Sequence, residues 1–204
     1  MFQVCIFCAK KCDVGAPAVI SPWIRELGID KRTSHYLKCE DCNLGFFTYR
    51  YNTEEMANIY SDYRGSRYFK IRSVWEPWYS NAYNSNHDSL DWVQSRKLAI
   101  TKFITPRLVN PALRVADIGG DTGQFIPDFA TLKYVVDPSG KNAAAGVTCI
   151  SEMKDLPDVD LIIYAHVLEH VADPVAEIKA LMSKVNQIYV EVPFGVSLSN
   201  VALE

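Results

Sequence analysis

The residues Val115–Phe125 read VADIGGDTGQF, and this stretch decides the fold of the second half of the chain. An apolar run leads into an acidic residue, Asp117, and then into three glycines, Gly119, Gly120 and Gly123. This order predicts a strand, a tight glycine turn and the start of a helix. A glycine turn lets a ligand approach the backbone, and a helix start offers N–H groups to that ligand. The stretch therefore predicts a loop that binds a cofactor.

The spacing within the loop narrows the kind of cofactor. The dinucleotide fingerprint G-x-G-x-x-G does not fit Gly119, Gly120 and Gly123, and no Gly-Lys-Ser/Thr follows as in a P-loop. Asp121 lies where a further glycine would be expected, and its carboxylate would repel a phosphate. We interpret Asp121 in two compatible ways. It is the N-cap of a helix that begins at Thr122, and it is a charge that attracts a cofactor's ammonium group.

Short apolar runs alternate with helical segments from this loop onward. The runs are LRVADIG, KYVVDP, GVTCIS, DLIIYAHV and QIYVEVP, and the helical segments include TGQFIPDFA and DPVAEIKALMSKV. Alternation of this kind is typical of βα units. The sequence therefore predicts an α/β fold, with about five parallel strands in one sheet and helices on both of its faces.

The same residues resemble class I S-adenosylmethionine-dependent methyltransferases. The loop follows their acid-x-Gly-x-Gly-x-Gly pattern except at Asp121, and SEMKDLPDVDLIIYAHVLEHVADP resembles their segment from the third strand through the fourth. The resemblance covers residues from about 113 to 194. It implies a Rossmann-like methyltransferase sheet that is C-terminally truncated, because the family's sheet normally has two further strands. It also implies S-adenosylmethionine as the cofactor.

The resemblance assigns roles to residues at the ends of successive expected strands. Asp137 would accept both hydroxyls of the ribose, as an acid does in dinucleotide folds. Glu152 would bind the adenine amino group, and Met153 would pack on the ring. His166 is the candidate general base, and His87 is a second candidate. The other implied cofactor-binding residues lie in the glycine loop and after the fourth strand: Asp117, Gly119, Gly120, Asp121, Gly123, Tyr164, Ala165 and His166.

Two cysteine pairs near the N-terminus predict a metal site. Cys5 and Cys8 form one C-x2-C pair, and Cys39 and Cys42 form another after 30 intervening residues. Without an export signal, matched pairs indicate metal binding more than disulfides. Four thiolates complete a tetrahedral zinc site with no open position, so we expect structural zinc. We interpret Cys12 as a free thiol, with replacement of a ligand as the alternative.

The composition divides the chain into three expected parts: a zinc-ribbon-like domain (1–50), a helical and aromatic linker region (51–107) and an incomplete S-adenosylmethionine-binding domain (108–204). In the linker region we expect two helices. Thr53 would cap the first, and the second would begin near Asp88 or Ser89. The aromatic run SRYFKIRSVWEPWYSNAY is either the wall of a substrate pocket or core that joins the domains.

The run LKCEDCNLGFFTYRYNTEEMANIYSDYRGSRYF is similar to methyltransferases that carry an N-terminal zinc ribbon and modify sugar nucleotides, surface polysaccharides or natural-product sugars. It implies methyl transfer to a small-molecule or glycan acceptor. Two alternatives stay open: a zinc-ribbon RNA methyltransferase, and a truncated, non-catalytic cofactor-binding module. The formal net charge of −3 argues against a nucleic-acid partner.

Other patterns set expectations for location and partners. No apolar run reaches the roughly 18 residues that a bilayer requires, and no signal peptide is apparent, so we expect a cytoplasmic protein without a membrane partner. A homodimer could form through the uncovered edge of the sheet. His166 to His170 match the H-x-x-E-H of inverted zinc proteases. We reject that function because His166 should end a strand rather than lie on a helix, and we expect Glu169 and His170 to hold the loop locally.

Overall fold

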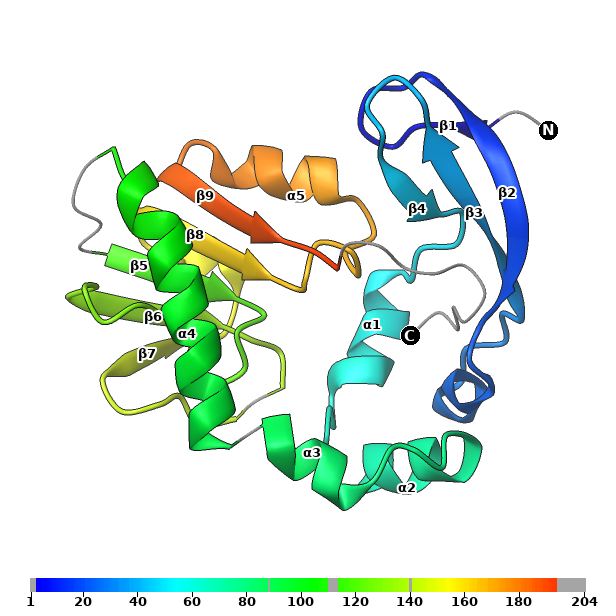
Figure 1. The fold of residues 1–204 in the computed structure, drawn as a ribbon, viewed down its shortest axis with the longest axis horizontal. Coiled ribbons are helices and arrows are strands. Elements are labelled where there is room, and N and C mark those ends of the chain that lie inside the picture. The colour runs from blue at the N-terminus through cyan, green and yellow to red at the C-terminus, as the bar shows by residue number, and fades with distance from the viewer. Residues whose placement is uncertain (1–2, 88, 110–113, 140, 194–204) are drawn as a thin grey trace.

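The N-terminal part of the protein is a small antiparallel sheet. The computed structural model describes residues 3–87, 89–109, 114–139 and 141–193 (Figure 1). Four strands pair in chain order: β1 (Gln3–Val4), β2 (Lys11–Val19), β3 (Thr33–Cys39) and β4 (Gly45–Phe47). A 3-10 helix, η1 (Pro22–Leu27), lies between β2 and β3. The runs SHYLKC and LGFFTYRY thus contain strands, as their β-like composition predicts.

The C-terminal part contains a five-stranded parallel sheet, which confirms the predicted α/β class. Its strands are β5 (Arg114–Ile118), β6 (Leu132–Val136), β7 (Val147–Ile150), β8 (Val159–Ala165) and β9 (Val185–Glu191). The spatial order is β7-β6-β5-β8-β9, and every neighbouring pair is parallel. The order therefore reverses between β5 and β8. In the described residues β9 is an outer strand, and dimerisation through it stays a prediction.

Helices connect the two sheets and cover the parallel one. They are α1 (Thr53–Tyr60), α2 (Ser66–Trp75), α3 (Asn81–His87), α4 (Leu90–Ile104) and α5 (Pro174–Leu181), with 3-10 turns η2 (Thr105–Arg107) and η3 (Met153–Asp155). Figure 1 shows α1 between the two sheets, with α3 and α2 along the lower side of the view. No helix of the described ranges combines the length and apolar character that a bilayer crossing needs.

The two faces of the parallel sheet bind different helices. Ile100 of α4 packs in one cluster with Leu161, whereas Leu181 of α5 packs in another with Ile162. Leu161 and Ile162 are consecutive in β8, so their side chains point to opposite faces. The prediction of helices on both faces is confirmed. Helix α4, which lies within the expected linker region, is thus part of the layered α/β unit.

The linker region departs from the prediction at its helices. Four helices occur between residues 51 and 107 instead of two, because the aromatic and arginine side chains of α2 hide any apolar helical period. Ser89 is the N-cap of α4, as predicted. Helix α1 begins at Thr53, but its N-cap is Asn52, which forms a capping box with Glu55. The assignment of Thr53 as the N-cap is therefore wrong.

The helix predicted directly after the glycine loop does not form. Residues 119–131 form turns, and α5 is the helix of the C-terminal half that the sequence correctly located. Asp121 has a φ of 55° and Gly123 has a φ of 75°, values that a right-handed helix does not contain. The N–H of Ala144 donates to the carbonyl of Thr122 at 2.8 Å. Asp121 is therefore a turn residue, and its assignment as a helix N-cap is wrong.

Part of the aromatic run in the linker region is core, and part is exposed. Tyr68 and Tyr79 are buried with Trp23 of η1, so they join the N-terminal part to α2. The guanidinium of Arg72 lies among these rings, and its Nε is 2.6 Å from the carboxylate of Glu76. The pair is buried, and the core interpretation holds for this part of the run. The exposed members are Trp75, Trp78 and Tyr83.

We predict that Glu76→Gln lowers the free energy of unfolding by about 3 kcal/mol, because it leaves the Arg72 charge buried without its partner. Urea unfolding measures this change. Asp30→Asn is the matched control, since the Asp30–Arg32 pair spans 3.9 Å and is exposed. Equal effects of the two substitutions would contradict the importance of the buried pair.

Candidate functional site

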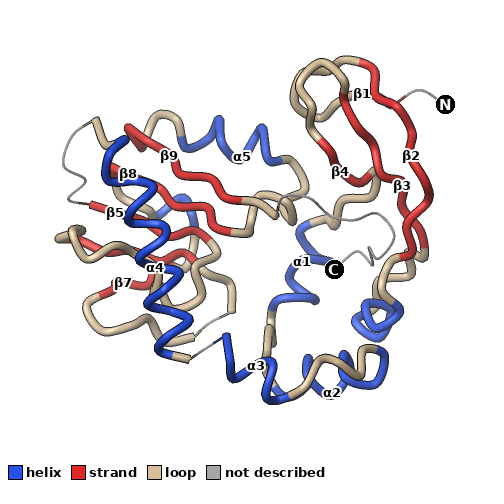
Figure 2. The backbone as a smooth tube through the Cα atoms, in the orientation of Figure 1, coloured by secondary structure: helices blue, strands red, loops and turns tan. Residues whose placement is uncertain are grey.

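The predicted cofactor residues gather at one edge of the parallel sheet. Strands β5, β6 and β8 end at Ile118, Val136 and Ala165, so the glycine loop, Asp137 and His166 follow directly. All five strands are parallel, and their carboxyl ends therefore share this edge, where Figure 2 shows several of the loops. The order of the sheet reverses between β5 and β8. Open α/β sheets bind ligands at such a position.

Two positions in the loop require glycine, because a side chain there would clash with neighbouring side chains. Gly119 has a φ of 65°, and a Cβ there would lie 2.7 Å from Val167 in the loop after β8. A Cβ on Gly120 would lie 2.2 Å from the carboxylate carbon of Asp117. The glycine loop therefore rests directly on the Asp117 side chain and on the neighbouring loop. Any larger residue at Gly120 would displace the carboxylate.

Asp117 is the most unusual group at this edge. Its side chain is 1% exposed, and neither carboxylate oxygen has a hydrogen-bond partner within the described structure. Burial raises the pKa of Asp117 to about 8, repulsion by Asp137 adds to the effect, and Arg96 opposes it. A buried polar group without a partner is costly. This carboxylate is thus suited to a ligand that brings a cation or donors to it.

Asp137 ties the glycine loop to the end of β6. Its two carboxylate oxygens accept hydrogen bonds from the N–H groups of Asp121 and Ser139, both at 2.8 Å. Each oxygen of a carboxylate can accept more than one hydrogen bond. Asp137 therefore shapes the loop and still has capacity for the two hydroxyls of a ribose.

Asp121 already has a cationic partner. The Lys141 ammonium lies 2.9 Å from its carboxylate, and the N–H of Asp121 is held by Asp137. The charge that was expected to attract a ligand's ammonium is therefore neutralised within the protein. Within the described residues Asp117 makes no such ion pair, so it is better placed for that role than Asp121.

The remaining predicted cofactor residues differ in their placement. Glu152 precedes η3 and pairs with Lys154 at 2.7 Å in an exposed position, while Met153 is partly buried against the cluster under α5. Tyr164 is fully buried, and its hydroxyl donates to Glu177 of α5 at 3.0 Å. Its side chain thus serves the packing of α5. Ala165 ends β8 and His166 begins the loop; the cofactor roles of all these residues stay predictions. The side chain of His87 lies outside the described residues.

His166 is held between two carboxylates. Its Nε2 lies 3.2 Å from Glu191, and its Nδ1 lies 3.5 Å from Glu169. The pKa of His166 is raised, first by the hydrogen bond with Glu169, because an imidazolium donates from both nitrogens. A φ of 60° turns the backbone sharply after β8. The residue lies in a turn beyond a strand, which is inconsistent with the helix that a zinc protease motif requires.

Sequence reasoning missed the residues that surround His166. Arg96 of α4 pairs with Glu191 at 2.8 Å, and the hydroxyl of Tyr189 donates to the other oxygen of Glu191 at the same distance. No motif marks these residues, since they come from a helix and an outer strand far apart in the sequence. The alternation of polar and apolar residues in QIYVEVP gave the only available signal, because Tyr189 and Glu191 share one face of β9.

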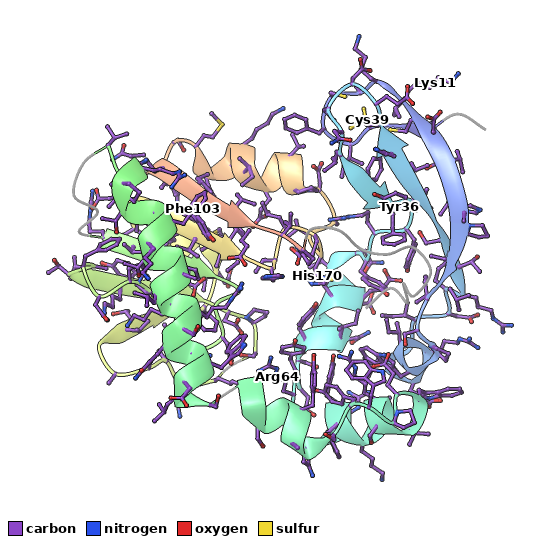
Figure 3. The ribbon with its side chains drawn as sticks, in the orientation of Figure 1. Lys11, Tyr36, Cys39, Arg64, Phe103 and His170 are labelled. Atoms are coloured by element: carbon purple, nitrogen blue, oxygen red, sulfur yellow. The ribbon has the colours of Figure 1, made fainter. Side chains whose placement is uncertain are left out.

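The second candidate site is the cysteine cluster. The Sγ atoms of Cys5, Cys8, Cys39 and Cys42 all lie within 4.8 Å of one another, and two of the separations are 3.5 and 3.6 Å. Tetrahedral Zn–S bonds of about 2.3 Å give S···S separations of about 3.8 Å. The four side chains therefore fit a single zinc ion. Figure 3 marks Cys39 at the far end of the antiparallel sheet.

The backbone of the first cysteine pair favours a thiolate. Burial would raise the pKa of Cys5, but backbone hydrogen bonds from Cys8 and Phe7 lower it to about 7. Cys12 is different, because burial beside Cys39 raises its pKa to about 11. Cys12 is buried, and it is not among the four clustered ligand atoms. The structure thus agrees with its interpretation as a free thiol.

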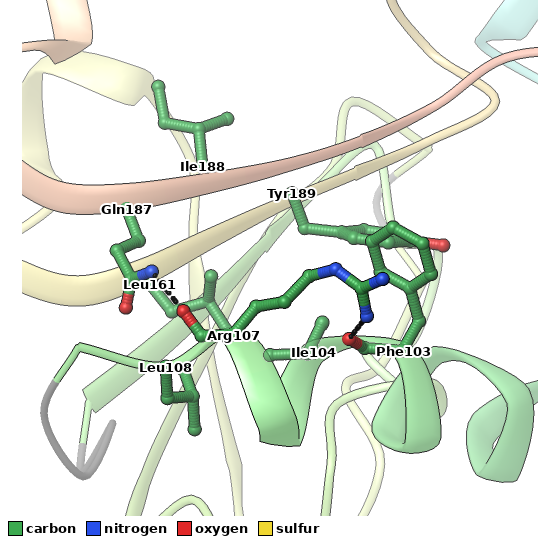
Figure 4. A pocket seen from close by; sticks show the side chains of 8 residues that line it. All are labelled: Phe103, Ile104, Arg107, Leu108, Leu161, Gln187, Ile188 and Tyr189. Atoms are coloured by element: carbon green, nitrogen blue, oxygen red, sulfur yellow. Dashed lines mark hydrogen bonds between the residues drawn. The ribbon is translucent and has the colours of Figure 1, made fainter.

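A shallow hollow lies between the end of α4 and strands β8 and β9 (Figure 4). Its polar groups pair with each other: the Gln187 amide donates to the carbonyl of Arg107 at 2.9 Å. The Arg107 guanidinium stacks 4.0 Å from the centre of the Phe103 ring. None of the predicted site residues lines this hollow. Its lining residues are Phe103, Ile104, Arg107, Leu108, Leu161, Gln187, Ile188 and Tyr189.

Comparison of the chain with protein-family models and with curated proteins finds no match. The assignment of a function therefore depends on the chemistry of the two sites. One is a four-thiolate cluster that could hold a metal ion such as zinc. The other is a loop-lined edge of a parallel sheet with a buried, unpartnered carboxylate.

We predict about one zinc ion per chain, because four clustered thiolates form a closed tetrahedral set. Cys39→Ser should lose most of the metal and melt at a lower temperature. Cys149→Ser is the matched control, since Cys149 is exposed and distant in the sequence, and Cys12→Ser should also retain the ion. Elemental analysis measures the metal. Full zinc content in Cys39→Ser would contradict the assignment of this ligand.

We predict that Asp117→Asn stabilises the ligand-free protein at about pH 8 but not near pH 4. The folded-state pKa of Asp117 is raised, so folding retains a proton that the unfolded chain loses, and wild-type stability falls as pH rises from about 4 to about 8. The neutral amide removes this loss, with an expected gain of about 1–3 kcal/mol. Urea unfolding across this pH range measures it.

The control for this measurement is Asp158→Asn, because Asp158 is exposed and precedes β8 at the opposite edge of the sheet. Its unfolding over the same pH range shows what the loss of an exposed aspartate alone does. A pH-independent difference between Asp117→Asn and wild type would show that Asp117 is ionised in the folded protein, contrary to the prediction.

Proposed function

We propose that this protein binds S-adenosylmethionine at the carboxyl edge of its parallel sheet and transfers the methyl group to a small-molecule or glycan acceptor. The observation that carries the proposal is the buried Asp117 carboxylate, which has no hydrogen-bond partner among the described residues and lies directly beneath Gly120. The site can accommodate a cation, whereas a phosphate would fit there poorly. S-adenosylmethionine has a ribose, an ammonium group and a sulfonium, and it has no phosphate.

The strand order supports the same proposal. The order β7-β6-β5-β8-β9 corresponds to 3-2-1-4-5 when the strands are counted from β5, which is the arrangement of a Rossmann-like sheet around its first strand. The glycine loop follows that first strand, and Asp137 follows the second. A Rossmann-like methyltransferase sheet places its cofactor loop and its ribose-binding acid in this relation.

A dinucleotide fits the edge less well. Its pyrophosphate would approach the glycine loop, where the buried carboxyl group of Asp117 lies. No helix begins at the loop, so the helix N-terminus that normally holds a pyrophosphate is missing from the described residues. The loop therefore favours a cofactor that is cationic over one that is anionic.

Different residues of the edge would contact different parts of the proposed cofactor. Asp137 would hold the ribose hydroxyls, and Glu152 and Met153, which follow β7, would lie near the adenine. Asp117 would attract the ammonium group of the methionine end. The bound sulfonium supplies an activated methyl group, so the protein contributes mainly proximity and orientation.

His166 is the proposed general base for an acceptor hydroxyl. It is about two-fifths exposed at the same edge, and Glu169 and Glu191 fix its ring. Because its pKa is raised, the neutral form that can accept a proton predominates only above that raised value. Methyl transfer to a hydroxyl should accordingly become faster as the pH rises through the pKa of His166. The acceptor class rests on the sequence resemblance and on the net charge of −3.

We predict that the protein binds S-adenosylhomocysteine in isothermal titration calorimetry and that Asp137→Asn weakens the affinity about ten-fold or more, because one acceptor for the ribose is lost. Asp158→Asn, an exposed change at the opposite sheet edge, should bind as wild type does. Absence of heat at millimolar ligand, with the protein folded and metal-loaded, would contradict the proposed cofactor.

A further inference from the structure

We propose that Arg50 is a positioning residue for this site: it holds the loop Val167–Val171 against the glycine loop, so that the metal-binding N-terminal part supports the cofactor edge. The identity of the ligand, S-adenosylmethionine, rests on the proposed function. The contact between Arg50 and the loop does not, since it is a feature of the described structure.

Arg50 makes its hydrogen bonds across a long stretch of sequence. Its Nη2 donates to the carbonyl of Leu168 at 3.1 Å and also to the carbonyl of Val171. Its Nε is buried without a partner among the described residues, and burial lowers the pKa of Arg50 while the charge of Glu169 opposes that effect. Burying part of a guanidinium is costly. The cost is offset only while the loop presents both carbonyls together.

The same loop also contacts the cofactor edge. Val167 lies where a Cβ on Gly119 would clash at 2.7 Å, so the loop limits the position of the glycine turn. The N–H of His170 donates to the carbonyl of Val167 at 2.9 Å, which closes the loop into a turn. Glu169, in the middle of this turn, contacts His166. Movement of the turn would thus change both the glycine loop and the candidate base.

A second contact comes from the helical linker. The rings of Tyr60 in α1 and His170 lie 5.9 Å apart, and Figure 3 places His170 between the parallel sheet and α1. Arg50 itself follows β4, whose residue Phe46 pairs with Leu37 of β3. The strand β3 ends at Cys39 of the cysteine cluster. The antiparallel sheet that carries the cysteine cluster is therefore continuous in the chain with Arg50, which reaches the loop Val167–Val171.

A purely structural role would make Arg50 matter for stability alone. A positioning role makes it matter for the loop and the ligand while the two sheets stay folded. The two roles can be separated, because each sheet has its own buried core and Arg50 belongs to neither. The Arg50→Lys variant keeps the charge, but an ammonium on a different stem replaces the planar guanidinium whose Nη2 donates to both carbonyls.

The experiment compares wild type, Arg50→Ala, Arg50→Lys and Arg32→Ala, all loaded with zinc. Arg32 is an exposed arginine of the same N-terminal part and serves as the matched control. We expect Arg50→Ala to retain zinc and to bind S-adenosylhomocysteine about ten-fold more weakly. Amide hydrogen exchange in Val167–Val171 should accelerate by a similar factor, with Arg50→Lys intermediate and Arg32→Ala unchanged.

Unchanged exchange in this loop for folded, zinc-loaded Arg50→Ala would overturn the proposal. Accelerated exchange with unchanged affinity would also overturn it, because the loop would then not position the site. If wild type itself does not bind S-adenosylhomocysteine, the proposed cofactor is wrong and the exchange measurement alone decides whether Arg50 holds the loop. If Arg50→Ala does not fold, the exchange and affinity of Arg50→Lys decide it.

Discussion

The cofactor edge depends on one constraint: a carboxylate is buried beneath a glycine turn, and no described residue forms a hydrogen bond with it. Asp117 is the last but one residue of β5, and its carboxylate leaves no room for a side chain on Gly120. The raised pKa of Asp117 reflects the cost of this arrangement. Such a cost is common at functional sites, where a ligand completes what the protein leaves unpaired. The other polar residues of the edge are organised around this group, with Asp137 holding the loop and Arg96 nearby.

The two halves of the protein meet at the loop after β8. Its turn touches the glycine loop through Val167, the N-terminal part through Arg50 and the linker through His170. Parallel strands bring their carboxyl ends together whatever their sequence separation, so this loop lies at the reversal of the strand order. The antiparallel sheet has no predicted catalytic group. By supporting the loop after β8, it would have a role at the cofactor edge in addition to holding a metal ion.

The sequence predicted the strands, the cysteine cluster and α5, because apolar runs, C-x2-C spacing and Asp173-Pro174 are local signals. It failed where tertiary contacts decide the outcome. Asp121 resembles a helix cap, yet its N–H is held by Asp137 and its carboxylate by Lys141, so the chain turns instead. Likewise, His166 contacts Glu191 of β9, which in turn pairs with Arg96 of α4, and no short pattern connects these residues.

The central claim is that S-adenosylmethionine binds at the carboxyl edge and not elsewhere. Titration of isotope-labelled, zinc-loaded protein with S-adenosylhomocysteine, followed by NMR amide shifts, tests it most directly. We predict saturable shifts concentrated at Gly119–Gly123, Asp137 and Glu152, with little change in the hollow lined by Phe103 and Gln187. Shifts confined to that hollow, or no saturable shifts at all, would contradict the claim.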